Sequence, residues 1–453
     1  MKNENFKQKK LIKNLLLFVL LFCSTVTVYS QSQLKKWHFN GEGVDFSTGV
    51  PVVYSMPVSL TGAESASNGF YSPGGDLFYV LDNKLYDKNG GLIDVFEPFN
   101  PLYDRMGPEI IVIPIPGICT KFYIVYLDIE TYTTGTLLYL RSDLRYSEFD
   151  MTLNSGLGGI TPGKKHLLVT SIGLDAIGSI AVSKLKPNGI RNLYFVASEA
   201  YGGKVIKCEV DLNGISNPQI IYQSFNNDFA TCEVELSHDE TMLAFGNLKK
   251  GGSGNTVDVT LLHLDANGNL NTSLGNNGVT TYDLPGSISQ AFTGVEFSPD
   301  NTKLFVGAPG VGVYWIYLSG NGNFPLISNS LPLADSHLEL AYNGWIYAAT
   351  STNQLRAIDP DPVLPVLATG LGAAINFTSN PIIANQHTTW TFNNPAIRVI
   401  PDQIDGEDYD YIFLADLECC RFYNAYDKTS FTATVSATWD PGFNPINNGS
   451  GAT

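Results

Sequence analysis

Two stretches of the sequence, ELSHDETMLAFG at residues 235–246 and EFSPDNTKLFVG at residues 296–307, have the same layout. Each runs from an apolar segment through a polar turn into a second apolar segment. Weaker copies stand at residues 70–80 (FYSPGGDLFYV) and 339–349 (ELAYNGWIYAA). Apolar or β-branched runs on both sides of a polar turn are typical of paired antiparallel strands. The repeat therefore predicts a structure assembled from similar β-hairpins.

A third strand follows each hairpin and ends at a turn rich in Asn and Gly. Asn-Gly pairs tolerate positive φ and suit tight reversals between antiparallel strands. The closures are DKNGGL (87–92), KPNGIR (186–191), DLNGIS (211–216), DANGNL (265–270) and SGNGNF (319–324). Successive clear copies of the hairpin begin about 60 and about 40 residues apart. This spacing predicts an all-β β-propeller of four-stranded blades with loops of variable length.

Six blades follow one another along the chain, and a seventh combines its two ends. We expect the six at residues 65–96, 107–150, 176–224, 231–284, 291–330 and 336–368. The seventh would pair residues 34–40 and 50–56 with strands from 375–426, which closes the ring and removes exposed sheet edges. Six or eight blades are the nearest alternatives. Two stacked β-sandwiches would not repeat the hairpin so regularly.

The N-terminus has the form of a secretory signal. Five lysines precede the apolar run LLLFVLLF at residues 15–22, and the small residues Val28 and Ser30 follow it. This pattern predicts cleavage after Ser30. The apolar run is too short to cross a bilayer, which takes about 20 residues. Lipid attachment at Cys23 is the alternative, although the preceding Phe22 is bulky for that modification.

After removal of residues 1–30, we expect a β-propeller over residues 31–426. Residues 427–453 form an extension or the start of a further module. The whole chain carries 27 basic and 43 acidic residues. Residues 1–30 hold five lysines and one glutamate, so their removal changes the net charge from −16 to −20. This acidity disfavours nucleic acid as a partner, and no later stretch predicts a transmembrane segment.

Five cysteines remain after the signal. Cys208 and Cys232 lie in successive strand-like segments and could form a disulfide in an oxidising compartment. Cys419 and Cys420 are adjacent and do not form a C-x-x-C motif. Buried free thiols are the expected state for most of these residues, Cys119 included.

Several segments resemble the N-terminal propeller of large secreted Bacteroidetes proteins that are exported by the type IX system, within the wider group of WD-like and lactonase-like propellers. They are WHFNGEGVDFSTGVP (37–51), FDMTLNSGLGGIT (149–161), EFSPDNTKLFV (296–306), LPLADSHLELAYNGWIYAA (331–349) and PDQIDGEDYDY (401–411). The resemblance implies residence outside the cell or at its surface. It implies no catalytic residues.

The sequence contains no motif for nucleophilic, nucleotide-dependent or zinc-dependent catalysis. There is no G-x-S-x-G, H-E-x-x-H, Walker loop or G-x-G-x-x-G. The six histidines are dispersed, which favours structural hydrogen bonding over metal binding; they are His38, His166, His238, His263, His337 and His387. We therefore predict no catalytic residue, no cofactor and no named metal ligand.

Two acidic segments and two aromatic groups were considered as binding sites. The five acidic residues Asp402, Asp405, Glu407, Asp408 and Asp410 offer oxygen ligands for Ca²⁺, but their spacing departs from the calcium-loop pattern. The same holds for Asp265, Asn267 and Asn269. Aromatic residues could form a glycan-binding face, although strand alternation favours core packing; they are Tyr314, Trp315, Tyr317, Trp345 and Tyr347.

Two functions remain open at the level of sequence. The first is a secreted or cell-surface, non-catalytic propeller that binds protein or polysaccharide. The second is a lactonase-like or lyase-like enzyme with a divalent metal in the central channel. We expect the loops at residues 249–256 and 370–395 to shape the binding face, because loops on a rigid scaffold usually carry recognition.

Overall fold

The fold is described from a computed structural model. It describes residues 36–377 apart from loop segments, and beyond residue 377 only six short strands. The segments left out are 40, 48–49, 59–66, 73–74, 82–83, 97–104, 119, 135–136, 175–177, 200–201, 225–227, 252–253, 285–293, 309–311, 320–324, 328–336, 351–353, 361–362 and 370–372. The expected signal at residues 1–30 lies outside the described residues.

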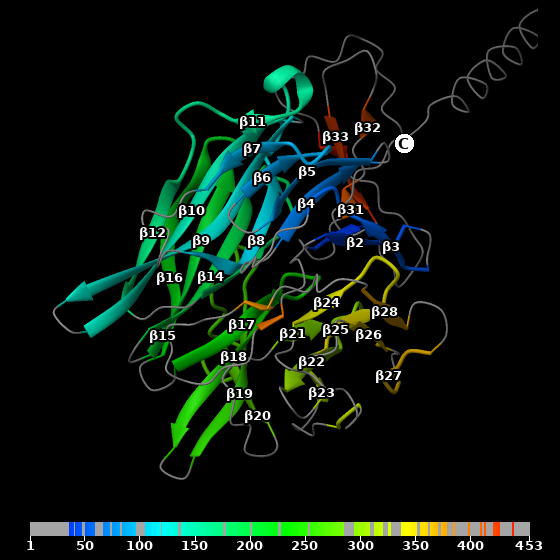
Figure 1. The fold of residues 1–453 in the computed structure, drawn as a ribbon. Helices are drawn as coiled ribbons and strands as arrows, with labels where there is room; N and C mark the ends of the chain where they lie inside the picture. The colour runs from blue at the N-terminus through cyan, green and yellow to red at the C-terminus, as the bar shows by residue number, and fades with distance from the viewer. Residues whose placement is uncertain are drawn as a thin grey trace, which may run out of the picture.

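Seven antiparallel sheets follow one another between residues 36 and 376 (Figure 1). The first three contain β1 (Lys36–His38), β2 (Glu42–Asp45) and β3 (Val52–Ser55); β4 (Ser67–Ser72), β5 (Gly75–Leu81), β6 (Lys84–Asp87) and β7 (Leu92–Val95); and β8 (Arg105–Pro114), β9 (Lys121–Thr134), β10 (Leu137–Asp150), β11 (Gly159–Ile160) and β12 (Leu167–Leu174).

The other four sheets continue in the same order. They contain β13 (Gly178–Val182), β14 (Arg191–Glu199), β15 (Gly202–Asp211) and β16 (Gly214–Ser224); β17 (Asp228–Leu236), β18 (Met242–Gly251), β19 (Gly254–His263) and β20 (Val279–Asp283); β21 (Val295–Phe297), β22 (Lys303–Ala308) and β23 (Gly312–Tyr317); and β24 (Leu338–Leu340), β25 (Ile346–Ala349), β26 (Gln354–Asp359), β27 (Val366–Leu367) and β28 (Ala374–Asn376).

The first strands of successive sheets are neighbours from β1 through β4, β8, β13, β17 and β21 to β24. Within each sheet the following strands pair outward, one after another. Sheets that share an inner series of first strands in this way are the blades of a β-propeller. The chain is therefore an all-β, seven-bladed propeller, and the prediction of seven blades is confirmed.

The expected blade positions agree with the sheets, with differences in strand number. The sheet β8–β12 extends past residue 150 to Leu174, and the sheet β21–β23 has three strands. β28 pairs with β26, so this part of the expected seventh blade belongs to the preceding sheet. β1, β2 and β3 pair only with one another among the described strands. Ring closure through strands shared by the two chain ends stays a prediction.

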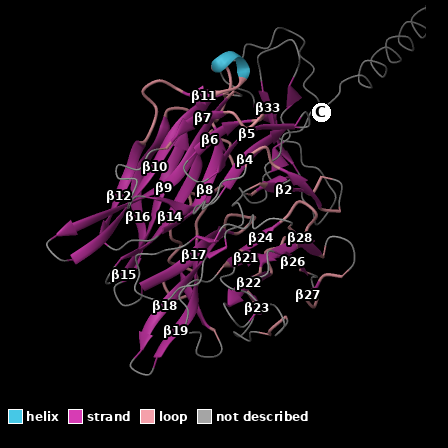
Figure 2. Ribbon diagram, viewed as in Figure 1, coloured by secondary structure: helices cyan, strands magenta, loops and turns pink. Residues whose placement is uncertain are grey.

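The remaining described strands form small separate sheets. They are β29 (Ala384–Asn385), β30 (Ile397–Arg398), β31 (Asp408–Tyr409), β32 (Ile412–Phe413), β33 (Cys420–Ala425) and β34 (Ala437–Thr438). Figure 2 shows strands as the dominant element, with one short 3-10 turn, η1 (Asn154–Gly156). Within the described part of the chain, no helix has the length and apolarity that a membrane crossing requires.

Aspartates and glycines form the turns between neighbouring strands. Asp87 Oδ1 accepts hydrogen bonds from the amides of Asn89 (2.7 Å) and Gly91 (2.9 Å), while Gly90 has a φ of 83°. The turn at Asp265 repeats this arrangement, with Gly268 at a φ of 77°. A side-chain acceptor and a residue that tolerates positive φ thus fix the reversal, as the Asn-Gly closures predicted.

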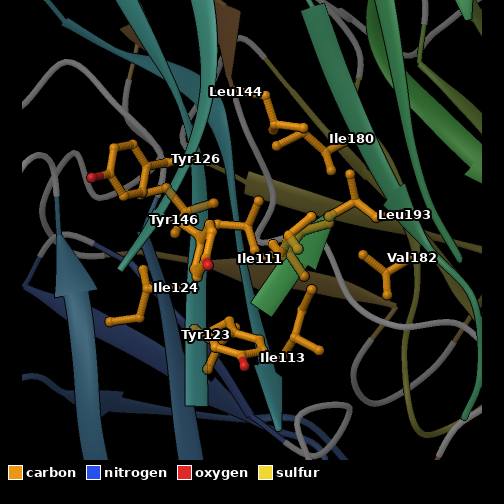
Figure 3. Packing of buried hydrophobic residues seen from close by; sticks show 14 of the residues in the cluster. Ile111, Ile113, Tyr123, Ile124, Tyr126, Leu144, Tyr146, Ile180, Val182 and Leu193 are labelled. Atoms are coloured by element: carbon orange, nitrogen blue, oxygen red, sulfur yellow. The ribbon is translucent and has the colours of Figure 1, made fainter. Parts of the chain in front are cut away.

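The hydrophobic core consists of layers between neighbouring sheets. The largest layer packs residues of β8, β9 and β10 against the sheet β13–β16, as Figure 3 shows for Ile111, Leu144, Ile180 and Leu193. Alternate residues of a strand point to opposite faces of its sheet, so a sheet with a neighbour on each face contributes to two layers. This packing fixes the inner strands and the side chains that they carry.

The first sheet packs against the seventh through aromatic side chains. Trp37 and Phe46 contact the ring of Tyr347, with ring centroids 5.7 and 5.3 Å apart. On the other side, His38 stacks on Tyr79 of β5 at 6.2 Å. The N-terminal sheet therefore contacts both the sheet β24–β28 and the sheet β4–β7.

Candidate functional site

Three inner strands carry a buried glutamate at the same position of the repeat. In each case the glutamate lies two residues before the turn of the blade's first hairpin; the three residues are Glu235, Glu296 and Glu339. Their exposed fractions are 3%, 0% and 1%. A carboxylate is costly to bury unless it is hydrogen-bonded or paired. Their partners therefore decide whether the site is structural or chemical.

A fourth glutamate, Glu233 on β17, connects three blades through one carboxylate. Its Oε2 accepts hydrogen bonds from the amides of Val295 (2.9 Å) and Leu338 (3.1 Å). Its Oε1 lies 2.6 Å from Nδ1 of His337, the residue before β24. Glu233 and His337 are both buried. The sheets that begin with β17, β21 and β24 thus meet at this side chain.

Glu296 makes a related bond between two blades. Its Oε2 accepts a 2.7 Å hydrogen bond from the amide of Leu340 on the next inner strand. An inner strand of a blade presents backbone amides that its own sheet does not pair, and a buried amide needs an acceptor. These carboxylates supply acceptors at the junctions between blades.

Burial raises the pKa of Glu233, since desolvation disfavours the charged form, and the neighbouring His337 opposes this effect. One oxygen of Glu233 lies within 4.8 Å of carboxylate oxygens of Glu235 and Glu339. Like charges at this separation in a buried setting repel each other strongly. The geometry favours a state in which protons or a positive charge offset part of the negative charge.

We tested whether Glu233, Glu235 and Glu339 fit a divalent cation. A carboxylate offers about four lone-pair sites. On Glu233 the two amides and the imidazole already take three of these sites. A cation would compete with these bonds between blades. We therefore assign Glu233 and Glu296 to contacts between blades.

The expected acidic loop at Asp265, Asn267 and Asn269 is a turn held by protein groups. Asp265 Oδ1 accepts the amides of Asn267 and Asn269, both at 2.9 Å. Lys207 Nζ, from β15, donates to Asn269 Oδ1 (2.6 Å) and to the carbonyl of Asn267 (3.1 Å). A lysine ammonium thus occupies the position among the oxygens that a metal ion would need.

Four of the other histidines have structural partners. His166 Nδ1 lies 2.6 Å from the hydroxyl of Tyr126, and His263 Nε2 lies 2.9 Å from the hydroxyl of Thr280. The His38 ring stacks on Tyr79, whereas for His238 it is the backbone amide that donates to Asn301 Oδ1. The expectation of dispersed, structural histidines agrees with these contacts. His337 is the one that sequence reasoning missed as a member of a charged junction.

The aromatic residues considered for glycan binding lie mostly in the core. Tyr314, Trp315 and Tyr347 have exposed fractions of 8%, 5% and 0%. Trp345 packs partly buried against the layer between the first and seventh sheets. Tyr317 is exposed, and its hydroxyl donates a 2.7 Å hydrogen bond to the carbonyl of Val363. Core packing, the interpretation favoured by strand alternation, is confirmed for the first three.

Cys208 is a buried free thiol on β15, so the disulfide considered with Cys232 is not formed. Its apolar surroundings raise its pKa to about 12. Several other expected features fall outside what the structure describes: the side chains of Cys232 and of residues 401–411, all of His387, and most of the loop 370–395.

The sequence repeat contained a signal for the buried glutamates of the inner strands. Each of the copies ELS, EFS and ELA opens with the glutamate that the structure buries on an inner strand. A charged residue at a position that should face the core is a sign of a specific partner. Glu233 and His337 gave no such signal, because they are 104 positions apart and only folding brings them together.

No family model matches the sequence, and no curated protein matches it. Solved structures show weak likeness. Sqt1 from Chaetomium thermophilum is 10% identical, with 56% of this chain and 70% of that chain covered and a TM-score of 0.30. The Cps50 (Swd1) beta-propeller domain from Myceliophteria thermophila is 9% identical, with 72% and 96% covered and a TM-score of 0.31.

Prolyl oligopeptidase B from Galerina marginata, bound to a 25mer macrocyclization substrate, is 10% identical with a TM-score of 0.31. The alignment covers 74% of this chain and 41% of that enzyme. Because these scores are low, the assignment of the fold rests on the pairing of the strands described above. No activity is transferred from these proteins.

Proposed function

We propose that this chain is a secreted or cell-surface, non-catalytic β-propeller that binds protein or polysaccharide through one of its faces. The proposal includes the likeness to the propellers of type IX-exported Bacteroidetes proteins. It also includes closure of the seven blades into a ring. The contacts of the N-terminal sheet with both the second and the seventh sheets support that closure.

Two extended hairpins carry the proposal. In the sheet β17–β20, the inner and outer strands pair with the hairpin only as far as Leu248 and Asp258, whereas β18 and β19 pair up to Gly251 and Gly254. In the sheet β8–β12, the hairpin of β9 and β10 continues to Thr134 and Leu137. Figure 1 shows both tips projecting beyond the neighbouring strands.

Both hairpins join the second and third strands of their sheets. The strand order is the same in successive blades, so these hairpins leave the propeller on the same face. Projecting loops on a rigid scaffold are a common place for recognition. By contrast, Glu233 and Glu296 on the inner strands are engaged in hydrogen bonds between blades.

Shortening the β18–β19 hairpin tests the binding face. Leu248 and Val257 are register partners, so an Asn-Gly turn can replace residues 249–256 without changing the remaining ladder. A screen of polysaccharides should give binding to the unchanged protein and weaker binding to the shortened one, with the same melting temperature. Leu212→Asn, an exposed residue in a turn between third and fourth strands, is the control and should bind normally.

Metal analysis and a screen of lactones and esters test the enzyme alternative with the same protein. We expect no turnover. A stoichiometric divalent metal together with chelator-sensitive turnover would overturn the non-catalytic proposal and establish the enzyme.

N-terminal sequencing of exported material tests the location. The mature chain should begin at Gln31, because the apolar run and the Val28/Ser30 site predict cleavage after Ser30. A lipid-modified Cys23 at the start, or an intact Met1 on protein that stays in the cytoplasm, would contradict this part of the proposal.

A further inference from the structure

The Glu233–His337 contact joins blades that are two steps apart. Glu233 belongs to the sheet that begins with β17, and His337 precedes β24, while the amide of Val295 comes from the sheet between them. The exposed fractions of Glu233 and His337 are 1% and 0%. Water therefore screens this contact little, and its strength depends on the charges of the two groups.

We propose that the Glu233–His337 pair joins the three blades in a pH-dependent way. The contact is strong in mildly acidic solution and weakens as the pH rises. One proton held between Oε1 of Glu233 and Nδ1 of His337, 2.6 Å apart, joins the two groups. Loss of that proton leaves a buried carboxylate beside a neutral ring. The junction then keeps a buried negative charge that this proton had offset.

The charged groups around the pair make its loosening stronger. The oxygens of Glu235, on the same strand, and of Glu339, on β24, lie within 4.8 Å of Glu233. On β21 the nearby acidic residue is Glu296, which binds Leu340. β13, which packs on β17, has no ionisable residue in its sequence GSIAV. The described carboxylates of Glu235 and Glu339 thus add negative charge to the junction.

Buried cations on the adjacent strands are engaged elsewhere. Arg191 of β14 donates to the carbonyl of Ser183, and Lys207 of β15 donates to the turn at Asn267 and Asn269. Lys303 of β22 has its ammonium over the ring of Tyr317, with 5.3 Å to the centroid. His337 is therefore the basic side chain that the structure places against Glu233.

The direction of the effect follows from proton binding. The pKa of Glu233 is raised in the folded protein, chiefly by burial, so the folded carboxyl holds its proton at a higher pH than the unfolded one does. Its contribution to stability is full below the unfolded pKa and is lost as the pH rises through the folded pKa. The raised pKa of Glu233 thus predicts that rising pH loosens the junction.

Hydrogen exchange at the amides of Val295 and Leu338 measures the strength of this contact directly. The full chain is exchanged into deuterated buffer across a pH series, and rates for peptides containing Val295 and Leu338 are corrected for intrinsic exchange. Protection of these amides should fall on the order of tenfold between about pH 6 and about pH 9, the effect of losing about one charged hydrogen bond. Peptides from β9, in the sheet β8–β12, should show constant protection.

Two variants separate a titrating pair from a merely structural contact. In His337→Gln the side chain can still donate a hydrogen bond but cannot titrate, so the pH dependence of protection should become weaker. Glu296→Gln is the matched control at the neighbouring junction and should keep the pH dependence of Val295 and Leu338. Constant protection in the unchanged protein, or an equal pH dependence in His337→Gln, would overturn the proposal. Because the unchanged protein is informative alone, misfolding of a variant does not remove the test.

Discussion

Single glycines show how tightly the turns of one blade fit the next. Gly268 and Gly189 have the same φ, 77°, and both end Asn-Gly turns. A Cβ on Gly268 would overlap the Asn192 amide and the Tyr194 hydroxyl, whereas a Cβ on Gly189 would meet no atom within 4 Å. The two positions therefore separate backbone strain from steric conflict between blades.

Alanine at these two glycines should destabilise the protein by different amounts. Gly189→Ala meets only the cost of positive φ, about 1 kcal/mol. Gly268→Ala adds the conflict with Asn192 and Tyr194, so we expect a loss of about 3 kcal/mol or more. Denaturant unfolding of both variants measures the difference. Equal losses would show that the turn at Gly268 moves away from its neighbour without cost.

At the scale of the element, the first turn of two successive blades, those beginning with β17 and β21, binds the first turn of the blade before it. The fourth residue of this turn is Glu240 in one blade and Asn301 in the next, and both have positive φ, 59° and 55°. Glu240 Oε1 accepts the amide of Lys184 at 2.7 Å, and Asn301 Oδ1 accepts the amide of His238 at 2.9 Å. At the next turn Gly344 stands at this position, and the preceding blade has Pro299, which has no amide hydrogen.

Substitutions at Asn301 should separate the bond between turns from the backbone strain. Asn301→Gly removes the acceptor but relieves positive φ, so its cost should be about 1 kcal/mol. Asn301→Ala removes the acceptor and keeps the strain, so its cost should be larger by about 1 kcal/mol. Thermal unfolding ranks the two.

Gly344→Asn is the control for this device, because Pro299 offers no hydrogen for the new side chain to accept. Its effect on the melting temperature should be small, since Asn tolerates positive φ and the position is open. A clear stabilisation by Gly344→Asn, or equal effects of Gly and Ala at residue 301, would contradict the proposed pairing of turns.

The sequence repeat was enough to predict these hairpins and their order, because strand alternation and turn chemistry are local properties. It placed the first hairpins of three blades at residues 235–246, 296–307 and 339–349. It could not predict that β28 pairs with β26, since short strands without a turn signal join a sheet through tertiary packing. The Glu233–His337 junction was also out of reach, because its residues meet only when three blades are assembled.

At the scale of the whole molecule, the N-terminal sheet covers an apolar surface of the last blade. Trp37 and Phe46 pack with Tyr347, Ala349 and Leu355 in one buried layer. On its other side β1 contacts β4 of the second blade. A propeller distributes its core among the gaps between blades, so loss of one sheet uncovers two neighbours at once.

Deletion of residues 31–60 should therefore destabilise the entire propeller. The truncated chain would expose the apolar faces that Trp37, Phe46 and His38 now cover, and the freed edges would favour association between molecules. We expect aggregation in size-exclusion chromatography with light scattering and a lower melting temperature. Val52→Thr, at a residue of the same sheet that is 51% exposed, is the matched control and should remain monomeric with a nearly unchanged melting temperature. A truncated protein that stays monomeric with the original melting curve would show that the N-terminal sheet is an appendage and that the other six blades hold together without it.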